Sequence, residues 1–124
     1  MENTYIYSYE WDDLNNSVKI FKFKVKYIFD KSITYLDNRY GSECEMNFNK
    51  VRLNRFVCGQ MLSFSNDEKT LEKFKNQLIR KSKDKIRRAE KRLNNLDKKY
   101  DENYNSLIKI IDSSTAEIEN ITKA

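Results

Sequence analysis

The sequence contains no histidine and no proline, and it has only two glycines and two cysteines among 124 residues. Without histidine, the commonest general base and metal ligand is missing, which excludes His-dependent catalytic triads and zinc sites that contain histidine. Two glycines cannot form a phosphate loop of the GxGxxG or P-loop type. Cys44 and Cys58 are too few and too far apart for a zinc site, and two reduced thiols are favoured over a single disulfide. We therefore expect no enzymatic activity, no cofactor and no metal.

Long apolar runs are missing as well. No window approaches the ~20 apolar residues of a membrane span, and the first residues do not have the pattern of a signal peptide, so we expect a cytoplasmic protein. Charged residues make up 35% of the chain, with a net charge of +5. The positive charge is concentrated in Lys69–Arg92, which holds 11 basic and three acidic residues. This segment predicts an anionic partner.

The first half of the chain has the pattern of an antiparallel sheet, and the second half has that of a helix. The length favours a single domain over residues 1–124. Tyrosine, isoleucine, phenylalanine and tryptophan, which favour strands, are dense near the N-terminus. The predicted elements are strands over 4–11, 17–29, 32–36, 43–48 and 60–65, with one or two helical turns within 49–57. The expected fold is α+β, with a sheet half of four to five strands (1–65), a long helix (66–112) that mediates oligomerisation, and a short terminal helix or tail (113–124).

The first predicted hairpin allows a register to be assigned. If Asn15 and Asn16 are the central turn residues, tyrosines of the first strand face lysines of the second. The predicted pairs are Tyr9 with Lys22, Tyr7 with Lys24 and Tyr5 with Lys26. The opposite face then points to the core and carries Ile6, Phe21, Phe23 and Val25, with Tyr27 and Phe29 continuing the same alternation.

The second half shows a helix start and a long apolar stripe. Ser65 and Glu68 have the spacing of a capping box. After them, apolar residues recur at spacings of three and four without interruption by glycine or proline, from Leu71 through Leu78 and Ile86 to Tyr100 and beyond. The first two or three turns are expected to pack on the sheet, and the remainder to leave it. A helix of this length presents more apolar surface than one small sheet covers. The stripe must pair with another chain or fold back on itself, and a homo-oligomer (a dimer or an assembly of dimers) is the simpler solution.

The first group of candidate binding residues is a set of arginines beside this stripe. Arg87, Arg88 and Arg92 lie near one another on the predicted helix, and guanidinium groups bind phosphate bidentately and stack on bases. The alternative is an ordinary solvated helix face. Candidates of the same chemistry in the first half are Lys24, Lys26, Arg39, Asn49, Arg52 and Arg55, with Phe64 as a surface for base stacking. Solubility, protection of sheet edges and core packing are the alternatives for these.

The order of these segments is similar to that of one protein family. An aromatic hairpin (TYIYSYEWDDLNNSVKIFKFKVKY) leads through MNFNKVRLNRF to LSFSNDEKTLEKFKNQLIRKSKDKIRRAEKR. From about Thr4 to Leu107 the chain resembles the phage Thoeris anti-defence proteins of the first type. The resemblance implies a homo-oligomeric sponge that binds cyclic ADP-ribose isomers, and in some members other cyclic nucleotides, without degrading them. It also implies a pocket at a subunit interface, with an aromatic side chain and an arginine around the adenine and basic groups near the phosphates.

Two other functions are compatible with the composition. A small basic coiled-coil protein that binds nucleic acid would use the basic helix as a phosphate track, although its basic side chains lie on several faces. A coiled-coil protein that inhibits a host protein would form a stable dimer without a small-molecule ligand. A sponge predicts capture of a cyclic nucleotide, and these alternatives do not.

Overall fold

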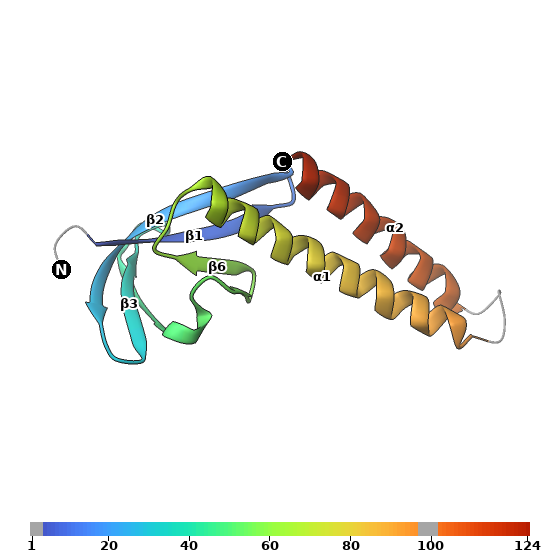
Figure 1. Ribbon diagram of the computed structural model, residues 1–124, viewed down its shortest axis with the longest axis horizontal. Helices are drawn as coiled ribbons and strands as arrows, with labels where there is room; N and C mark the ends of the chain where they lie inside the picture. The colour runs from blue at the N-terminus through green and yellow to red at the C-terminus, as the bar shows by residue number, and fades with distance from the viewer. Residues whose placement is uncertain (1–3, 97–101) are drawn as a thin grey trace. The chain divides into compact units, whose positions relative to one another are not determined.

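The computed structural model describes residues 4–96 and 102–124, and it confirms the α+β class. Six strands precede two helices (Figure 1). The strands are β1 (Tyr5–Asp12), β2 (Ser17–Ile28), β3 (Ser32–Asp37), β4 (Cys44–Asn49), β5 (Phe56–Val57) and β6 (Gln60–Ser63), with a 3₁₀ turn, η1 (Lys50–Arg52), between β4 and β5. The helices are α1 (Glu68–Asn94) and α2 (Glu102–Lys123). The chain divides into two compact units, Met1–Phe74 and Lys75–Ala124, which we call the sheet unit and the helical unit.

The sheet has one more strand than the upper limit of our prediction. All its ladders are antiparallel, and the strand order is β4-β3-β2-β1-β6-β5. The additional strand is β5, which is only two residues long and lies within the segment for which we expected helical turns. It pairs with β6 through a tight turn at Cys58 and Gly59, whose φ angles of 52° and 85° match a two-residue hairpin turn. Of the expected helical turns, only η1 is present.

The register of the first hairpin differs from the predicted one by two residues. Tyr7 pairs with Lys22 and Tyr5 with Lys24, because Asp12 and Ser17 form the last pair and leave a four-residue loop. The Asp12 carboxylate accepts hydrogen bonds from the backbone N–H groups of Leu14, at 3.0 Å, and of Asn15. These hydrogen bonds stabilise the longer loop. A shift of two residues keeps every side chain on its predicted face.

The predicted core face of the hairpin is confirmed for three of its four core residues. Ile6, Phe23 and Val25 are buried, together with residues of the other strands, and Phe21 packs at the margin of this cluster. The buried residues are Ile6, Phe23, Val25, Ile33, Tyr35, Phe48 and Leu62. The predicted alternation fails beyond Val25, because the register shifts between Val25 and Tyr27. Tyr27 and Phe29 are therefore exposed, at 48% and 52%.

The first turns of α1 pack on the sheet, as the sequence indicates. Phe74 is fully buried, and its ring centroid lies 5.8 Å from that of Tyr9 and 5.9 Å from that of Phe56. The predicted capping box is wrong by two positions. Asp67 is the N-cap, because its Oδ1 accepts hydrogen bonds from the backbone N–H of Thr70 at 2.8 Å and from its hydroxyl at 2.6 Å.

The helical unit contains two helices where one long helix was predicted over 66–112. α1 ends at Asn94, and α2 begins at Glu102 and includes the segment that we expected as a separate terminal element. The predicted stripe residue Tyr100 lies outside the described residues. α2 runs back along α1, and the Lys75 ammonium donates to the carbonyl oxygen of Ala124 (Figure 1).

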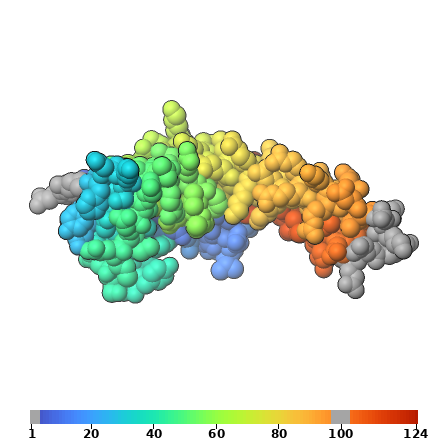
Figure 2. All heavy atoms as spheres, turned by 90° about the horizontal axis from the view of Figure 1, so that it is seen from below, coloured from blue at the N-terminus to red at the C-terminus, as the bar shows by residue number. Residues whose placement is uncertain are grey.

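The apolar stripe of α1 is therefore covered by the same chain. Buried residues of α1 include Leu78, Ser82 and Ala89, and those of α2 are spaced by seven residues, at Leu107, Ser114 and Ile121. In the space-filling view, atoms of α1 (yellow to orange) lie against those of the visible part of α2 (orange-red) (Figure 2). Because the stripe folds back on itself, it no longer argues for a second chain, and homo-oligomerisation stays a prediction.

Candidate functional site

The helical unit contains a groove between α1 and α2 with a volume of about 400 Å³. This is within the usual range of small-molecule sites, roughly 300–1,000 Å³. α1 contributes the side chains of Lys85, Arg88, Ala89 and Arg92. α2 contributes Leu107, Ile110, Ser113, Ser114 and Glu117. The surface is apolar at its base and cationic along the α1 side, and we call it the basic groove.

Local helical geometry explains why these side chains gather. Positions 85, 88, 89 and 92 follow the spacing of three and four that places side chains on one face of a helix. Ala89 and Ser114 are small and buried, so the two backbones approach and the longer side chains of Arg88 and Arg92 stand beside the contact. The sequence therefore builds a rim of cations around a floor of small and aliphatic residues.

The charges of the basic groove have no partners among the described residues. The side chains of Lys85, Arg88, Arg92 and Glu117 form no hydrogen bond or ion pair with any residue in 4–96 or 102–124. By contrast, Arg87 on the same helix pairs with Asp84 and does not line the groove. Unpaired cations at an apolar surface favour binding of an anion, because they lose no internal partner when it arrives.

The predicted candidates of the sheet unit are dispersed. Lys24 is exposed on β2, where it pairs in register with Tyr5 and Leu36. Lys26 forms an ion pair with Glu45 across the sheet. Within the described residues, neither lysine lies in the basic groove, whose lining comes from the helical unit.

Four more candidates lie between the end of β4 and the residue after β6, and two of them have structural roles. Asn49 caps η1, because its Oδ1 accepts a hydrogen bond from a backbone N–H at 3.0 Å. Arg52 donates from Nη2 to the carbonyl oxygen of Val57 at 3.4 Å, and its Nε is buried without a partner among the described residues. Arg55 is exposed, and Phe64 is 40% exposed just after β6. The structure does not gather these residues into one pocket.

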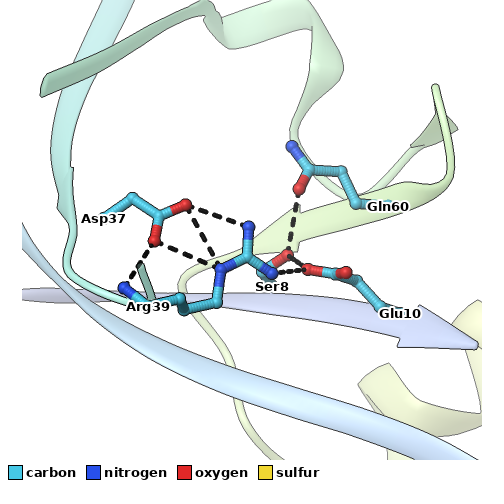
Figure 3. A network of polar contacts seen from close by, with 5 residues as sticks. All are labelled: Ser8, Glu10, Asp37, Arg39 and Gln60. Carbon is cyan, nitrogen blue, oxygen red and sulfur yellow. Dashed lines mark hydrogen bonds and ion pairs between the residues drawn. The ribbon is translucent and has the colours of Figure 1, made fainter. Parts of the chain in front are cut away.

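Arg39 is the centre of a polar network at one end of the sheet's core face (Figure 3). Its guanidinium donates to Asp37 at 2.9 Å and to Glu10 at 2.7 Å, and the Ser8 hydroxyl oxygen lies within hydrogen-bond distance of the side chains of Glu10 and Gln60. Hydrogen bonds from Arg39 lower the pKa of the Asp37 carboxyl, and the same contact raises the pKa of the guanidinium. Because these charges are already paired, the network stabilises the fold and leaves no free cation for a ligand.

The aromatic rings around Arg39 complete its environment. The guanidinium carbon lies 4.7 Å from the ring centroid of Phe21, 5.2 Å from that of Phe23 and 5.4 Å from that of Tyr40. A small cleft of about 370 Å³ adjoins this network, lined by Phe21, Arg39 and Tyr40 together with residues of the first hairpin. Stacking on aromatic faces is a common position for a structural arginine.

Some residues of the basic groove were missed by sequence reasoning. Lys85 precedes Arg88 by three residues and Arg92 by seven, a spacing that would have placed it with them. Ser113 and Glu117 carried no such signal, because their approach to α1 depends on the antiparallel return of α2. No aromatic residue is among the described residues that line the basic groove.

Other kinds of site find no support in the part of the chain that the structure describes. Residues 4–96 and 102–124 contain no group of three or more cysteine, aspartate or glutamate side chains able to hold a metal ion. None of their helices is long and apolar enough to cross a membrane. Comparisons with protein-family models, with curated proteins and with solved structures give no match for this chain.

Proposed function

We propose that this protein is a phage anti-defence sponge that binds a cyclic ADP-ribose-type nucleotide in the basic groove and does not degrade it. Sequestration of the signal would keep the Thoeris effector from being activated. The observation that carries this proposal is the set of three unpaired cations, Lys85, Arg88 and Arg92, beside an apolar floor of the right size. The family resemblance supplies the identity of the ligand, and the groove supplies a place where an anion of this size would bind.

The binding free energy that a sponge needs favours a second protein surface that closes the groove over the ligand. Hydrogen bonds to charged groups contribute about 1.5–3 kcal/mol each, so two or three contacts to a pyrophosphate give a gross ~3–9 kcal/mol. Nanomolar affinity needs about 12 kcal/mol. An open groove on two helices encloses a ligand from one side, whereas tight sites bury about 70–90% of it. We therefore propose a homo-oligomer in which a second copy closes the groove, although the apolar stripe itself no longer requires one.

Ligand capture tests the function directly. The full chain is incubated with cyclic dinucleotides and cyclic ADP-ribose isomers, washed and heated, and the released compounds are identified by mass spectrometry. We expect one cyclic ADP-ribose isomer to be retained and recovered intact. Retention of nothing from this panel would refute the proposal, and recovery of a hydrolysed product would show an enzyme instead of a sponge.

Arginine variants locate the site. Arg88→Ala and Arg92→Ala each remove one charged contact, so we expect affinity for the captured nucleotide to fall by about tenfold or more. Arg87→Ala is the matched control, because it removes the same side chain one position away but outside the groove. We expect it to change affinity less than threefold. An equal loss in Arg87→Ala and Arg88→Ala would remove the groove from the proposal.

A nucleic-acid-binding protein is the alternative that one observation favours. With α2 covering the apolar stripe, several basic side chains of α1 remain exposed outside the groove, among them Arg80, Lys83 and Lys91. Phosphate-track binding predicts that Arg87→Ala weakens binding as much as Arg88→Ala, with a steep dependence on salt. A gel shift at near-physiological salt without retention of duplex or single strands would exclude this alternative.

A further inference from the structure

The basic groove contains one carboxylate among its cations. Glu117 of α2 is half-buried, and its carboxylate has no hydrogen bond or ion pair with a described residue. A carboxylate repels phosphate, so it weakens a groove that only binds phosphate. Its presence beside three free cations indicates a ligand that has hydrogen-bond donors close to its anionic group.

The carboxylate and the arginines occupy different ends of the groove. α2 is antiparallel to α1, so residue numbers rise in opposite directions along the two helices. Glu117 therefore lies toward Lys85, whereas Leu107 lies toward Arg92. Seven residues separate Lys85 from Arg92, which corresponds to about 10.5 Å along the helix axis. The groove thus has an arginine end and, within small-molecule length, an end where the hydrogen-bond acceptor Glu117 lies toward Lys85.

We propose that Glu117 binds the hydroxyl groups of a ribose, while Arg88 and Arg92 bind the pyrophosphate attached to that sugar. The ligand class is a ribonucleoside diphosphate unit, either linear or within a cyclic nucleotide, and this inference rests on the proposed function. An ionised carboxylate only accepts hydrogen bonds, and the adjacent hydroxyls of ribose offer two donors to it. Nucleotide-binding folds use an acidic side chain on a ribose hydroxyl in the same way.

The test compares three probes on the full chain by calorimetric titration: inorganic pyrophosphate, ADP and 2′,3′-dideoxy-ADP. The variant is Glu117→Gln, which keeps the shape of the side chain and removes its charge. Glu119→Gln is the matched control, because Glu119 is an exposed glutamate of the same helix that does not line the groove. Circular dichroism spectra of the three proteins establish that the variants remain folded.

The proposal predicts changes of opposite sign for the different probes. Glu117→Gln binds ADP about tenfold more weakly and binds inorganic pyrophosphate more tightly than the wild type does. The wild type prefers ADP to 2′,3′-dideoxy-ADP by about tenfold, and Glu117→Gln has lost most of that preference. Glu119→Gln behaves as the wild type does. An unchanged preference in Glu117→Gln, a weaker binding of pyrophosphate to it, or no binding of ADP and pyrophosphate to the wild type would overturn the proposal.

These outcomes separate this inference from the proposed function. If a cyclic ADP-ribose isomer is captured but Glu117→Gln keeps the ribose preference, the role of Glu117 is wrong and the sponge stands. If no panel compound is captured while ADP discrimination depends on Glu117, the groove recognises ribose and the choice of cyclic ligand is wrong.

Discussion

Removal of the Arg39 guanidinium should destabilise the sheet unit. In Arg39→Met the aliphatic part of the side chain is kept, while the guanidinium and its contact with the Phe21 ring are lost. The variant leaves the carboxylates of Asp37 and Glu10 without their cation, and the Asp37 side chain is only 8% exposed. Two charged contacts at about 1.5–3 kcal/mol each give a gross ~3–6 kcal/mol. Because the side chains of Arg39 and Glu10 are 21% and 28% exposed, we expect the lower end, about 3 kcal/mol.

Urea denaturation followed by tryptophan fluorescence measures this loss. Trp11 is the only tryptophan of the chain and belongs to β1, so its emission reports on the sheet unit. With an m-value of about 1–3 kcal/mol/M, a loss of about 3 kcal/mol lowers the midpoint by ~1–3 M. Arg55→Met is the control, because Arg55 is an exposed arginine of the same unit, and we expect a change within about 0.5 kcal/mol.

A double-mutant cycle with Asp37→Asn isolates the contact. If the two groups interact as the distances indicate, the double variant loses less stability than the sum of the single variants, by about 0.5–3 kcal/mol. Additive losses, or an Arg39→Met midpoint equal to that of Arg55→Met, would refute the reasoning that this network stabilises the sheet.

Three further predictions concern pH, helix capping and a strained turn. The folded pKa of Asp37 is lowered by Arg39, so its contribution is present in full above the unfolded pKa of about 3.9 and is lost as the pH falls through the folded value. Asp37→Asn should therefore flatten the decline of the urea midpoint below about pH 4, and an unchanged slope contradicts this. Asp67→Ala removes the N-cap contacts to Thr70 and should cost about 1 kcal/mol by thermal unfolding, whereas no loss would reject the cap. Cys58, just before Gly59, has a positive φ angle, which glycine adopts without steric cost. Cys58→Gly should therefore leave the free energy of unfolding unchanged or raise it by up to ~1 kcal/mol, and a clear loss of stability would contradict the turn geometry.

The register error in the first hairpin shows what local sequence patterns leave open. Alternation of side chains decides which face of β2 is buried, and burial of Phe23 and Val25 follows from it. The same alternation tolerates a shift of two residues, because the faces repeat with that period. The Asp12 side chain selects the longer loop through its hydrogen bonds, and this choice depends on the folded geometry of the turn.

The candidate site also has one part that local sequence spacing determines and another that depends on the tertiary structure. The spacing of Arg88 and Arg92 on one helical face is a local property, so the sequence alone identified them. The apolar repeat also showed that the stripe needed a partner, but not which one, because a second chain and a returning helix bury the same residues. Only the tertiary structure decided that α2 covers α1, since pairing of distant segments depends on the chain reversal between them. That reversal brings Glu117 beside Lys85 and makes the groove, which no spacing within either helix determines.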